Sequence, residues 1–260
     1  MRLPSAPRRE FGQHFLVDEN IVAVAGRMAE LGSEDVVLEV GPGLGILTEH
    51  LADRVRLVHA IEIDRGLEPK LRERFAARAN VNFVFADALR HPLGALRPAP
   101  NKFVSNLPYN VATPVVAESL DGLPLVELWT VMVQREVADR FFAAPGTRSY
   151  GAVSVLVQLT AERTGFHPVP RTVFRPPPNV DSALVAFRRW RRWGPELAAL
   201  KKLVQASFAH RRKTIANSLA AAGFERARVI AALDAMELPA DVRAERLSPS
   251  QFVQLAELLA

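Results

Sequence analysis

Four consecutive residues, Asn106-Leu107-Pro108-Tyr109, combine the groups needed to hold a planar ring that carries an exocyclic amine. They follow residues 102–105, an apolar run that predicts a short buried strand. The side-chain carbonyl of Asn106 and the backbone carbonyl of Leu107 can both accept hydrogen bonds from an amino group. Pro108 fixes φ and has no competing N–H, and Tyr109 offers a face on which an unstacked base can pack. A strand-ending turn without chemistry is the alternative for so short a motif.

A second candidate site is the glycine-rich turn at residues 41–45, between the β-branched run 36–40 and a helical pattern that begins at Ile46. A strand, a glycine turn and a helix in this order are typical of nucleotide sites. The G-x-G-x-x-G dinucleotide fingerprint and the G-x-x-x-x-G-K-S/T phosphate loop are both absent. The spacing G-x-G-x-G instead suits a cofactor whose amino-acid part meets backbone groups, and S-adenosylmethionine is such a cofactor.

Two acidic residues support this cofactor. Glu62 comes directly after a predicted strand at 57–61, where its carboxylate can take both ribose hydroxyls. Asp87 follows a strand at 82–85, where it can accept a hydrogen bond from the adenine amine. Each acid alone could be a solvated strand-end carboxylate. Because each candidate follows a successive strand, the predicted cofactor contacts are Gly41, Gly43, Gly45, Glu62, Asp87 and Asn106.

Strands and helices alternate over the first 190 residues, which predicts an α/β fold with a parallel sheet and right-handed crossovers. The expected strands are 36–40, 57–61, 82–85, 102–105, 128–133 and 183–188, and the expected helices are 18–31, 46–51, 65–78, one capped by Thr113, and 134–144. Residues 150–170 are ambiguous between helix and strand. Helical patterns follow at 195–209, 211–222, 225–236 and 249–259, the last capped by Ser248. The predicted domains are therefore 1–190 and a small all-helical domain at 191–260.

The composition limits the possible functions of this chain of 260 residues. It contains no Cys, so disulfides, zinc thiolate sites and Cys nucleophiles are excluded. The histidines show no metal-ligand spacing, and no metal is expected. The basic N-terminus is followed by no apolar segment of the kind found in signal peptides, and no stretch approaches the length of a membrane span. We therefore expect a cytoplasmic protein with no membrane partner.

A basic segment dominates the net charge of +5. Residues 188–213 contain nine Lys and Arg against one acid, Glu196, with Trp190 and Trp193 interleaved. This pattern is compatible with an ordinary solvated helix face or with a phosphate-binding surface. The predicted RNA-binding residues are Arg188, Arg189, Arg211, Arg212 and Lys213.

Several uncommon motifs in the expected order resemble the KsgA/RsmA family of ribosomal-RNA adenine dimethyltransferases. They are the segment Phe11-Gly12-Gln13-His14-Phe15-Leu16, the loop Glu39–Gly45, Asn106–Asn110, Phe174–Ser182, and Phe208–Leu219 with Arg-Arg-Lys-Thr at 211–214. The resemblance implies a Rossmann-like class I methyltransferase domain with a small helical C-terminal domain. It also implies that His14, where many members have Asn, and Leu16 contact the cofactor.

The family reaction transfers four methyl groups to N6 of two adjacent adenosines in the 3′-terminal hairpin loop of 16S rRNA. The resemblance therefore implies a role in rRNA processing and ribosome biogenesis, with the small ribosomal subunit as partner of a monomeric enzyme. Asn106, Leu107, Pro108 and Tyr109 would form the catalytic motif. Phe174 would sandwich the flipped adenine against Tyr109, or else anchor the proline-rich turn in the core.

Two other functions remain open at this stage. A macrolide-resistance enzyme shares the fold and the reaction but modifies one adenosine of 23S rRNA. A non-catalytic ribosome-assembly factor could use the same fold, although the intact glycine turn and Asn106 favour catalysis.

Overall fold

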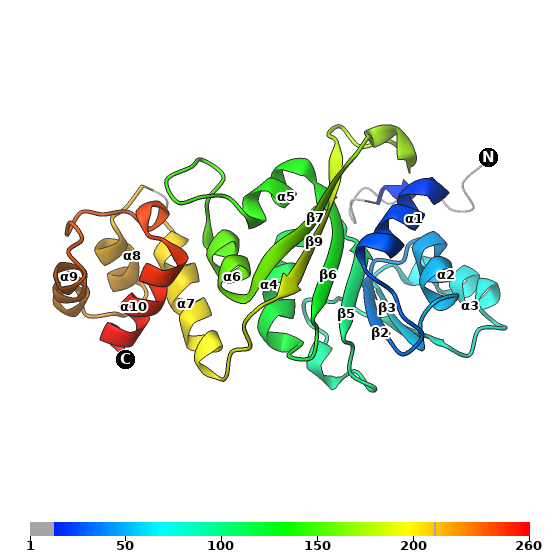
Figure 1. Ribbon diagram of the computed structural model, residues 1–260, viewed down its shortest axis with the longest axis horizontal. Helices are drawn as coiled ribbons and strands as arrows, with labels where there is room; N and C mark the ends of the chain where they lie inside the picture. Colours follow the sequence, from blue (N-terminus) through cyan, green and yellow to red (C-terminus); the bar gives the residue numbers. More distant parts are fainter. Residues whose placement is uncertain (1–12, 211) are drawn as a thin grey trace. The chain divides into compact units, whose positions relative to one another are not determined.

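The computed structural model describes residues 13–210 and 212–260 (Figure 1). Its contacts divide the chain into two compact units. Unit 1 contains the described residues up to Ala138 together with Glu162–Arg189, and unit 2 contains Asp139–Ala161 and Trp190–Ala260. Residues 139–161 thus differ from the expected division at 190/191. They belong to unit 2 because the apolar helix that they contain packs on the C-terminal helices.

Unit 1 is built on a seven-stranded sheet with the order β4-β3-β2-β5-β6-β9-β7. The strands are β2 (Val36–Val40), β3 (Leu57–Glu62), β4 (Val81–Phe85), β5 (Lys102–Asn106), β6 (Leu128–Gln134), β7 (Ala161–Val169) and β9 (Ser182–Arg189). Strands β2 to β6 pair in parallel, as predicted, whereas β9 runs antiparallel to β6. The short strands β1 (Phe15–Leu16) and β8 (Phe174–Arg175) form a separate antiparallel pair.

The helices of unit 1 begin close to their expected positions. They are α1 (Glu19–Met28), α2 (Ile46–Ala52), α3 (Glu68–Arg74), α4 (Ala112–Gly122) and the start of α5 (Arg135–Phe141). The carboxylate of Asp18 caps α1 by accepting from the backbone N–H groups of Asn20 and Ile21. The predicted Thr113 cap of α4 is wrong. The turn closed by the Val111 N–H and the Pro108 carbonyl leads directly into the helix, which therefore begins at Ala112.

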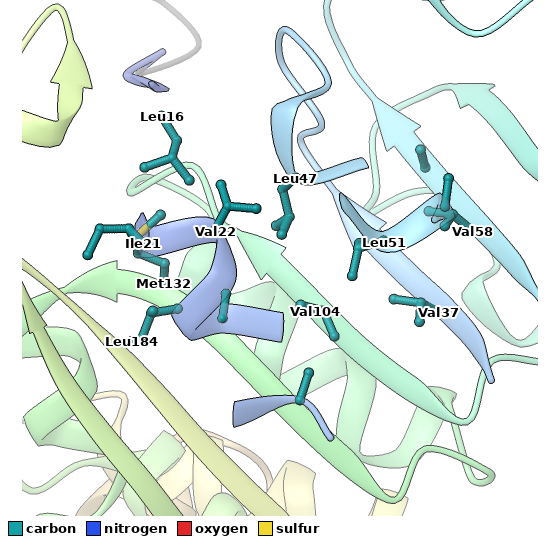
Figure 2. Close-up of a cluster of buried hydrophobic side chains, with 14 of the residues drawn as sticks. Leu16, Ile21, Val22, Val37, Leu47, Leu51, Val58, Val104, Met132 and Leu184 are labelled. Atoms are coloured by element: carbon teal, nitrogen blue, oxygen red, sulfur yellow. The ribbon is translucent and has the colours of Figure 1, made fainter. Parts of the chain in front are cut away.

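The two faces of the sheet are covered by different helices, as the two-residue period of a strand requires. On one face, Ile21 and Val22 of α1 and Leu47 and Leu51 of α2 gather over the strands (Figure 2). The strand side chains on this face are those of Val37, Val58, Val104, Met132 and Leu184. Trp129 points to the opposite face, where its indole N–H donates to the Ser119 hydroxyl of α4 at 2.9 Å. Burying each large apolar side chain contributes about 1.5–3 kcal/mol, which holds the helices on the sheet.

The strand order reverses between β2 and β5. From β2 the chain moves outward to β3 and β4, and it then returns to pair β5 on the other side of β2. In an open α/β sheet the carboxyl ends at such a reversal leave a crevice in which ligands bind. The glycine turn and the Asn106 motif follow the two strands that flank this point.

Unit 2 is helical. It contains α6 (Ala152–Thr160), α7 (Glu196–Phe208), α8 (Ile215–Ala221), α9 (Arg226–Ala235) and α10 (Pro249–Leu259). The predicted cap of the last helix is confirmed, because Ser248 and Gln251 form a reciprocal capping box. The buried Tyr150 hydroxyl donates to the Leu247 carbonyl at 2.8 Å and ties the 139–161 segment to the C-terminal helices. In the described ranges, no helix has both the length and the apolar character needed to cross a membrane.

The buried His59 of β3 predicts that the protein becomes less stable as pH falls. Its Nε2 lies 2.9 Å from the Pro98 carbonyl, which can only accept, and its Nδ1 lies 3.1 Å from the Asn82 amide. The ring is therefore neutral, and burial lowers the pKa of His59, an effect that the Pro98 hydrogen bond partly offsets. As pH falls below about 6.5, the unfolded chain takes up a proton before the folded chain does. The free energy of unfolding therefore decreases until pH reaches the folded pKa.

Urea unfolding between about pH 7 and pH 5 measures this effect. We expect the stability of His59→Asn to depend less on pH than that of the parent protein. Equal pH dependence in His59→Asn and the parent would contradict the assignment.

Candidate active site at the carboxyl ends of β2 and β5

The turn after β2 and the motif after β5 are in direct contact. Gly41 has a φ of +77°, and a Cβ atom there would lie 3.1 Å from Cδ of Pro108. The Ser105 hydroxyl donates to the Val40 carbonyl at 2.5 Å and accepts from the Val40 N–H at 3.2 Å. These contacts hold Asn106 beside the glycine turn.

A cavity opens at this contact. Its walls are the glycine turn (Gly41, Pro42, Gly43, Leu44), the motif Asn106 to Tyr109, the N-terminal segment Gln13 to Leu16, and Glu39, Ile46, Leu47, Glu62 and Ile63. The cavity thus brings together His14, Leu16, Gly41, Gly43, Glu62 and Asn106, all of which were predicted to contact the cofactor. Gly45 lies at the N-terminus of α2 instead, with a φ of +83°, where a Cβ atom would come within 2.6 Å of Phe75. Gly45 therefore permits helix packing and is not among the residues that line the cavity.

Glu62 lines this cavity and holds the backbone of the residues around it. Its side chain is almost fully buried, with Oε2 accepting from the Gly43 N–H at 3.1 Å and Oε1 accepting from the Asp64 N–H at 2.9 Å. Burial raises the pKa of Glu62, and these backbone N–H groups work against the increase. The carboxylate fixes the glycine turn while each oxygen keeps acceptor capacity for a hydroxyl group.

Glu39, the fourth of the five residues of the buried strand β2, is a site residue that the sequence analysis named only as the start of the motif Glu39–Gly45. It also lines the cavity, and in the described part of the chain its Oε2 has no hydrogen-bond partner. Burial, aided by the negative charge of Glu62, raises the pKa of Glu39 to about 8, and the Thr48 hydroxyl moderates this increase. A buried polar atom without a partner is costly, so Oε2 is suited to receive an N–H group of a bound molecule. The signal in the sequence was an acid inside an otherwise apolar strand.

A second cavity adjoins the first and shares Gly41, Glu62, Ile63 and Pro108 with it. Asp87 lies in this second cavity, where its Oδ1 accepts from the Leu89 N–H at 2.9 Å. Ile63 and Leu89 line it with side chains that are 44% and 39% exposed. These two apolar residues were also missed. Each follows one of the predicted acids closely, and their exposure suits contact with a flat ring.

The backbone and the aromatic ring of the Asn106 motif are both held by contacts. Leu107 is buried, and its N–H donates to the Met132 carbonyl at 3.0 Å. The Tyr109 hydroxyl lies 2.6 Å from the Ser182 hydroxyl, and burial raises the pKa of Tyr109. His14 stacks on the Tyr109 ring with centroids 5.5 Å apart, and its Nδ1 lies 2.8 Å from the Pro176 carbonyl. A base that stacks on Tyr109 must use the other ring face or displace His14.

The predicted stacking role of Phe174 is wrong in this structure. Its side chain is fully buried in the apolar cluster under α1, where it packs with residues of the sheet. The antiparallel pairing of β8 with β1 turns the ring inward. Phe174 therefore anchors the proline-rich turn, the alternative that the sequence left open.

The predicted RNA-binding residues separate into different environments. Arg189 is buried: its guanidinium donates to the carbonyls of Val126, Leu120 and Leu123 and lies 4.8 Å from the Trp129 ring centroid. It cannot contact RNA in this position, and this prediction is wrong. Arg188 forms an exposed ion pair with Glu30 at 2.6 Å. Arg212 and Lys213 are exposed between α7 and α8, and Arg211 lies outside the described residues.

The fold and the cavities define a class of enzyme. The parallel sheet, the glycine turn at the point where strand order reverses, and acids at the ends of the next two strands are those of a class I S-adenosylmethionine-dependent methyltransferase. A dimethyladenosine transferase from Plasmodium falciparum has this fold, with a TM-score of 0.73 at 23% identity over 93% of this chain and 96% of that chain.

Sequence comparison narrows the class. The model of the family described as ribosomal RNA adenine dimethylase matches residues 5–260. A ribosomal RNA small subunit methyltransferase A from Rubrobacter xylanophilus is 46% identical over 96% of this chain and 94% of its own length. The 23S rRNA methyltransferase ErmE is 33% identical over 94% of this chain and 99% of that chain, with a TM-score of 0.63. The chain belongs to the ribosomal RNA adenine dimethylase family.

The buried Arg189 predicts a stability effect. Replacing it with Lys removes the planar guanidinium that donates through two nitrogens to three carbonyls, so we expect the free energy of unfolding to fall by about 1–3 kcal/mol. The exposed Arg188→Lys is the matched control, and it should change stability by less than about 1 kcal/mol. Urea unfolding measures both variants. An Arg189→Lys protein of normal stability with weakened RNA binding would overturn the structural role.

Proposed function

We propose that this protein dimethylates N6 of two adjacent adenosines in the 3′-terminal hairpin loop of 16S rRNA, in the small ribosomal subunit. The observation that carries this proposal is the position of the Asn106 motif in the wall of the cavity formed by the glycine turn and Glu62. The relatives named small subunit methyltransferase A support the choice of substrate. The proposal includes a cytoplasmic location and a monomeric enzyme, as the family resemblance implies.

The donors along the two cavities fit S-adenosylmethionine in order. His14, Gly41 and Glu39, whose Oε2 has no hydrogen-bond partner among the described residues, surround the part of the cavity suited to an amino-acid group. Glu62 lies where the two cavities meet, at the place for the ribose. Asp87, with Ile63 and Leu89, lines the part suited to an adenine ring. When bound, this cofactor supplies an electrophilic methyl group on a sulfonium centre.

The Asn106 motif would hold the target amine. An aromatic amine is a weak nucleophile because its lone pair is delocalised into the ring. Acceptors on Asn106 and Leu107 can bind its N–H groups, favour a pyramidal nitrogen and direct the lone pair towards the methyl group. The attacking nitrogen would become positively charged and acidic as the C–S bond breaks and the thioether leaves, so its proton could pass to water without a strong base. For the second transfer to the same nitrogen, one remaining N–H still has an acceptor.

Tyr109 provides a test of base stacking. We expect Tyr109→Ala to lose about 5- to 100-fold in kcat/KM for the RNA substrate, the range for removing one base–aromatic stack. Calorimetry measures the affinity for S-adenosylmethionine separately, because Tyr109 also lines the first cavity and stacks on His14, and the loss in kcat/KM for RNA should exceed any loss of this affinity. Tyr109→Phe keeps the ring and loses only the hydroxyl contact to Ser182, so it should stay close to the parent. Full RNA activity in Tyr109→Ala would remove the stacking role.

Two other functions differ from this proposal in the RNA that would be methylated, or in the absence of methyl transfer. The 33% identity to ErmE keeps 23S rRNA as a second candidate. A non-catalytic assembly factor would bind the cofactor or the small subunit without methyl transfer.

A direct comparison of substrates distinguishes the three functions. Labelled S-adenosylmethionine is supplied with unmethylated small-subunit particles and, separately, with protein-free 23S rRNA. We expect labelled dimethyladenosine in the small-subunit RNA only, and Asn106→Ala should abolish it. Label in 23S rRNA only would replace the proposal with the resistance-type reaction. Cofactor binding without label in either RNA would favour the assembly factor.

A further inference from the structure

The segment Trp190–Trp193 caps the C-terminal end of α6 in unit 2. The backbone N–H groups of Trp190 and Arg191 donate to the Thr160 carbonyl at 3.1 and 3.3 Å. The indole N–H groups of Trp190 and Trp193 donate to the carbonyls of Gln158 at 3.2 Å and Leu159 at 3.0 Å. These bonds satisfy carbonyls that a helix end leaves unpaired. They also fix both indole rings by their edges.

The two indoles differ in how much of the ring is open. The guanidinium of Arg191 lies 3.8 Å from the Trp193 ring centroid and covers that ring. Trp190 is 53% exposed, although tryptophan is among the residues that proteins usually bury. Capping of α6 requires only the edge of Trp190, so capping alone does not explain its open surface. Because the ring is already held in place, a partner that stacks on it loses little side-chain entropy.

The surrounding charge indicates the chemistry of this partner. Unit 2 contains 13 Lys and Arg against 8 Asp and Glu, a difference of 13 − 8 = +5, which is the formal net charge of the whole chain. The remaining residues balance at 20 of each sign. Arg191 and Arg192 are exposed next to Trp190, while Arg212 and Lys213 are exposed beyond the other end of α7. The 13 residues of α7 separate these two basic groups by about 20 Å.

We propose that Trp190 is a stacking platform for an unpaired base of RNA, with Arg191 and Arg192 beside it to meet the adjacent phosphates. An open aromatic face next to cations is the combination that binds single-stranded nucleic acid without a requirement for one base. An apolar protein partner would carry no negative charge to pair with the neighbouring arginines. This inference rests on the proposed function for the identity of the RNA, but it concerns a surface of unit 2 and not the cavity of unit 1.

The test compares three variants in binding to an end-labelled 12-nucleotide oligoadenylate and to an RNA duplex of the same length. We expect Trp190→Ala to weaken oligoadenylate binding about 5- to 100-fold, while duplex binding stays nearly unchanged. Trp190→Phe keeps a ring but loses the bond to Gln158, and it should bind within about threefold of the parent. Leu125→Ala is the matched control, since Leu125 is 52% exposed and lies in unit 1.

The outcomes separate stacking from capping. Equal loss of binding in Trp190→Phe and Trp190→Ala would mean that only the cap of α6 matters, and would overturn the proposal. Unchanged oligoadenylate binding in Trp190→Ala would also overturn it. With small-subunit particles as substrate, we expect Trp190→Ala to raise KM and leave kcat unchanged. Failure of the parent to methylate these particles, together with Trp190-dependent oligoadenylate binding, would overturn the proposed function and leave this inference standing.

Discussion

The close approach of Gly41 to Pro108 is the contact on which the site depends. A side chain at Gly41 would meet Pro108 at 3.1 Å, in a backbone conformation with φ of +77° that favours glycine. Any larger residue would push the turn after β2 away from the motif after β5. The glycine turn and the Asn106 motif line one cavity because these two segments of the chain touch here. The Ser105 hydroxyl, which bridges to both backbone groups of Val40, reinforces the same contact from within the sheet.

The second constraint is electrostatic. Two carboxyl groups, on Glu39 and Glu62, are buried at the carboxyl ends of β2 and β3, and burial raises the pKa of each. Glu62 offsets the cost through backbone N–H groups of the turn that it holds in place. Glu39 keeps an oxygen without a partner in the described structure. A ligand with an ammonium group and vicinal hydroxyls would satisfy both acids, so these buried carboxyl groups suit the proposed cofactor.

The sequence predicted those parts of the site that depend on strand order. Residues after the first, second, third and fourth parallel strands had to meet at one edge of the sheet, and Gly41, Glu62, Asp87 and Asn106 do so. The sequence could not predict whether the Phe174 side chain faces the core, because its direction depends on the pairing of β8 with β1. The prediction that Arg189 contacts RNA was wrong for a similar reason. Its position in a run of cations suggested solvent, but the end of β9 places it over Trp129 and the carbonyls that follow α4.

Because residues 139–161 belong to unit 2, the segment Trp190–Trp193 both caps α6 and presents an exposed aromatic ring among basic side chains. Helix α6 ends where β7 begins, and the last carbonyls of a helix have no donors within the helix itself. The chain provides them when it leaves β9, through Trp190 to Trp193. A cap made from indole edges leaves ring surface exposed among arginines, so a requirement of the helix end creates a surface suited to RNA. Unit 1 contains both cavities and has balanced charge, whereas the basic excess of unit 2 favours a polyanionic partner.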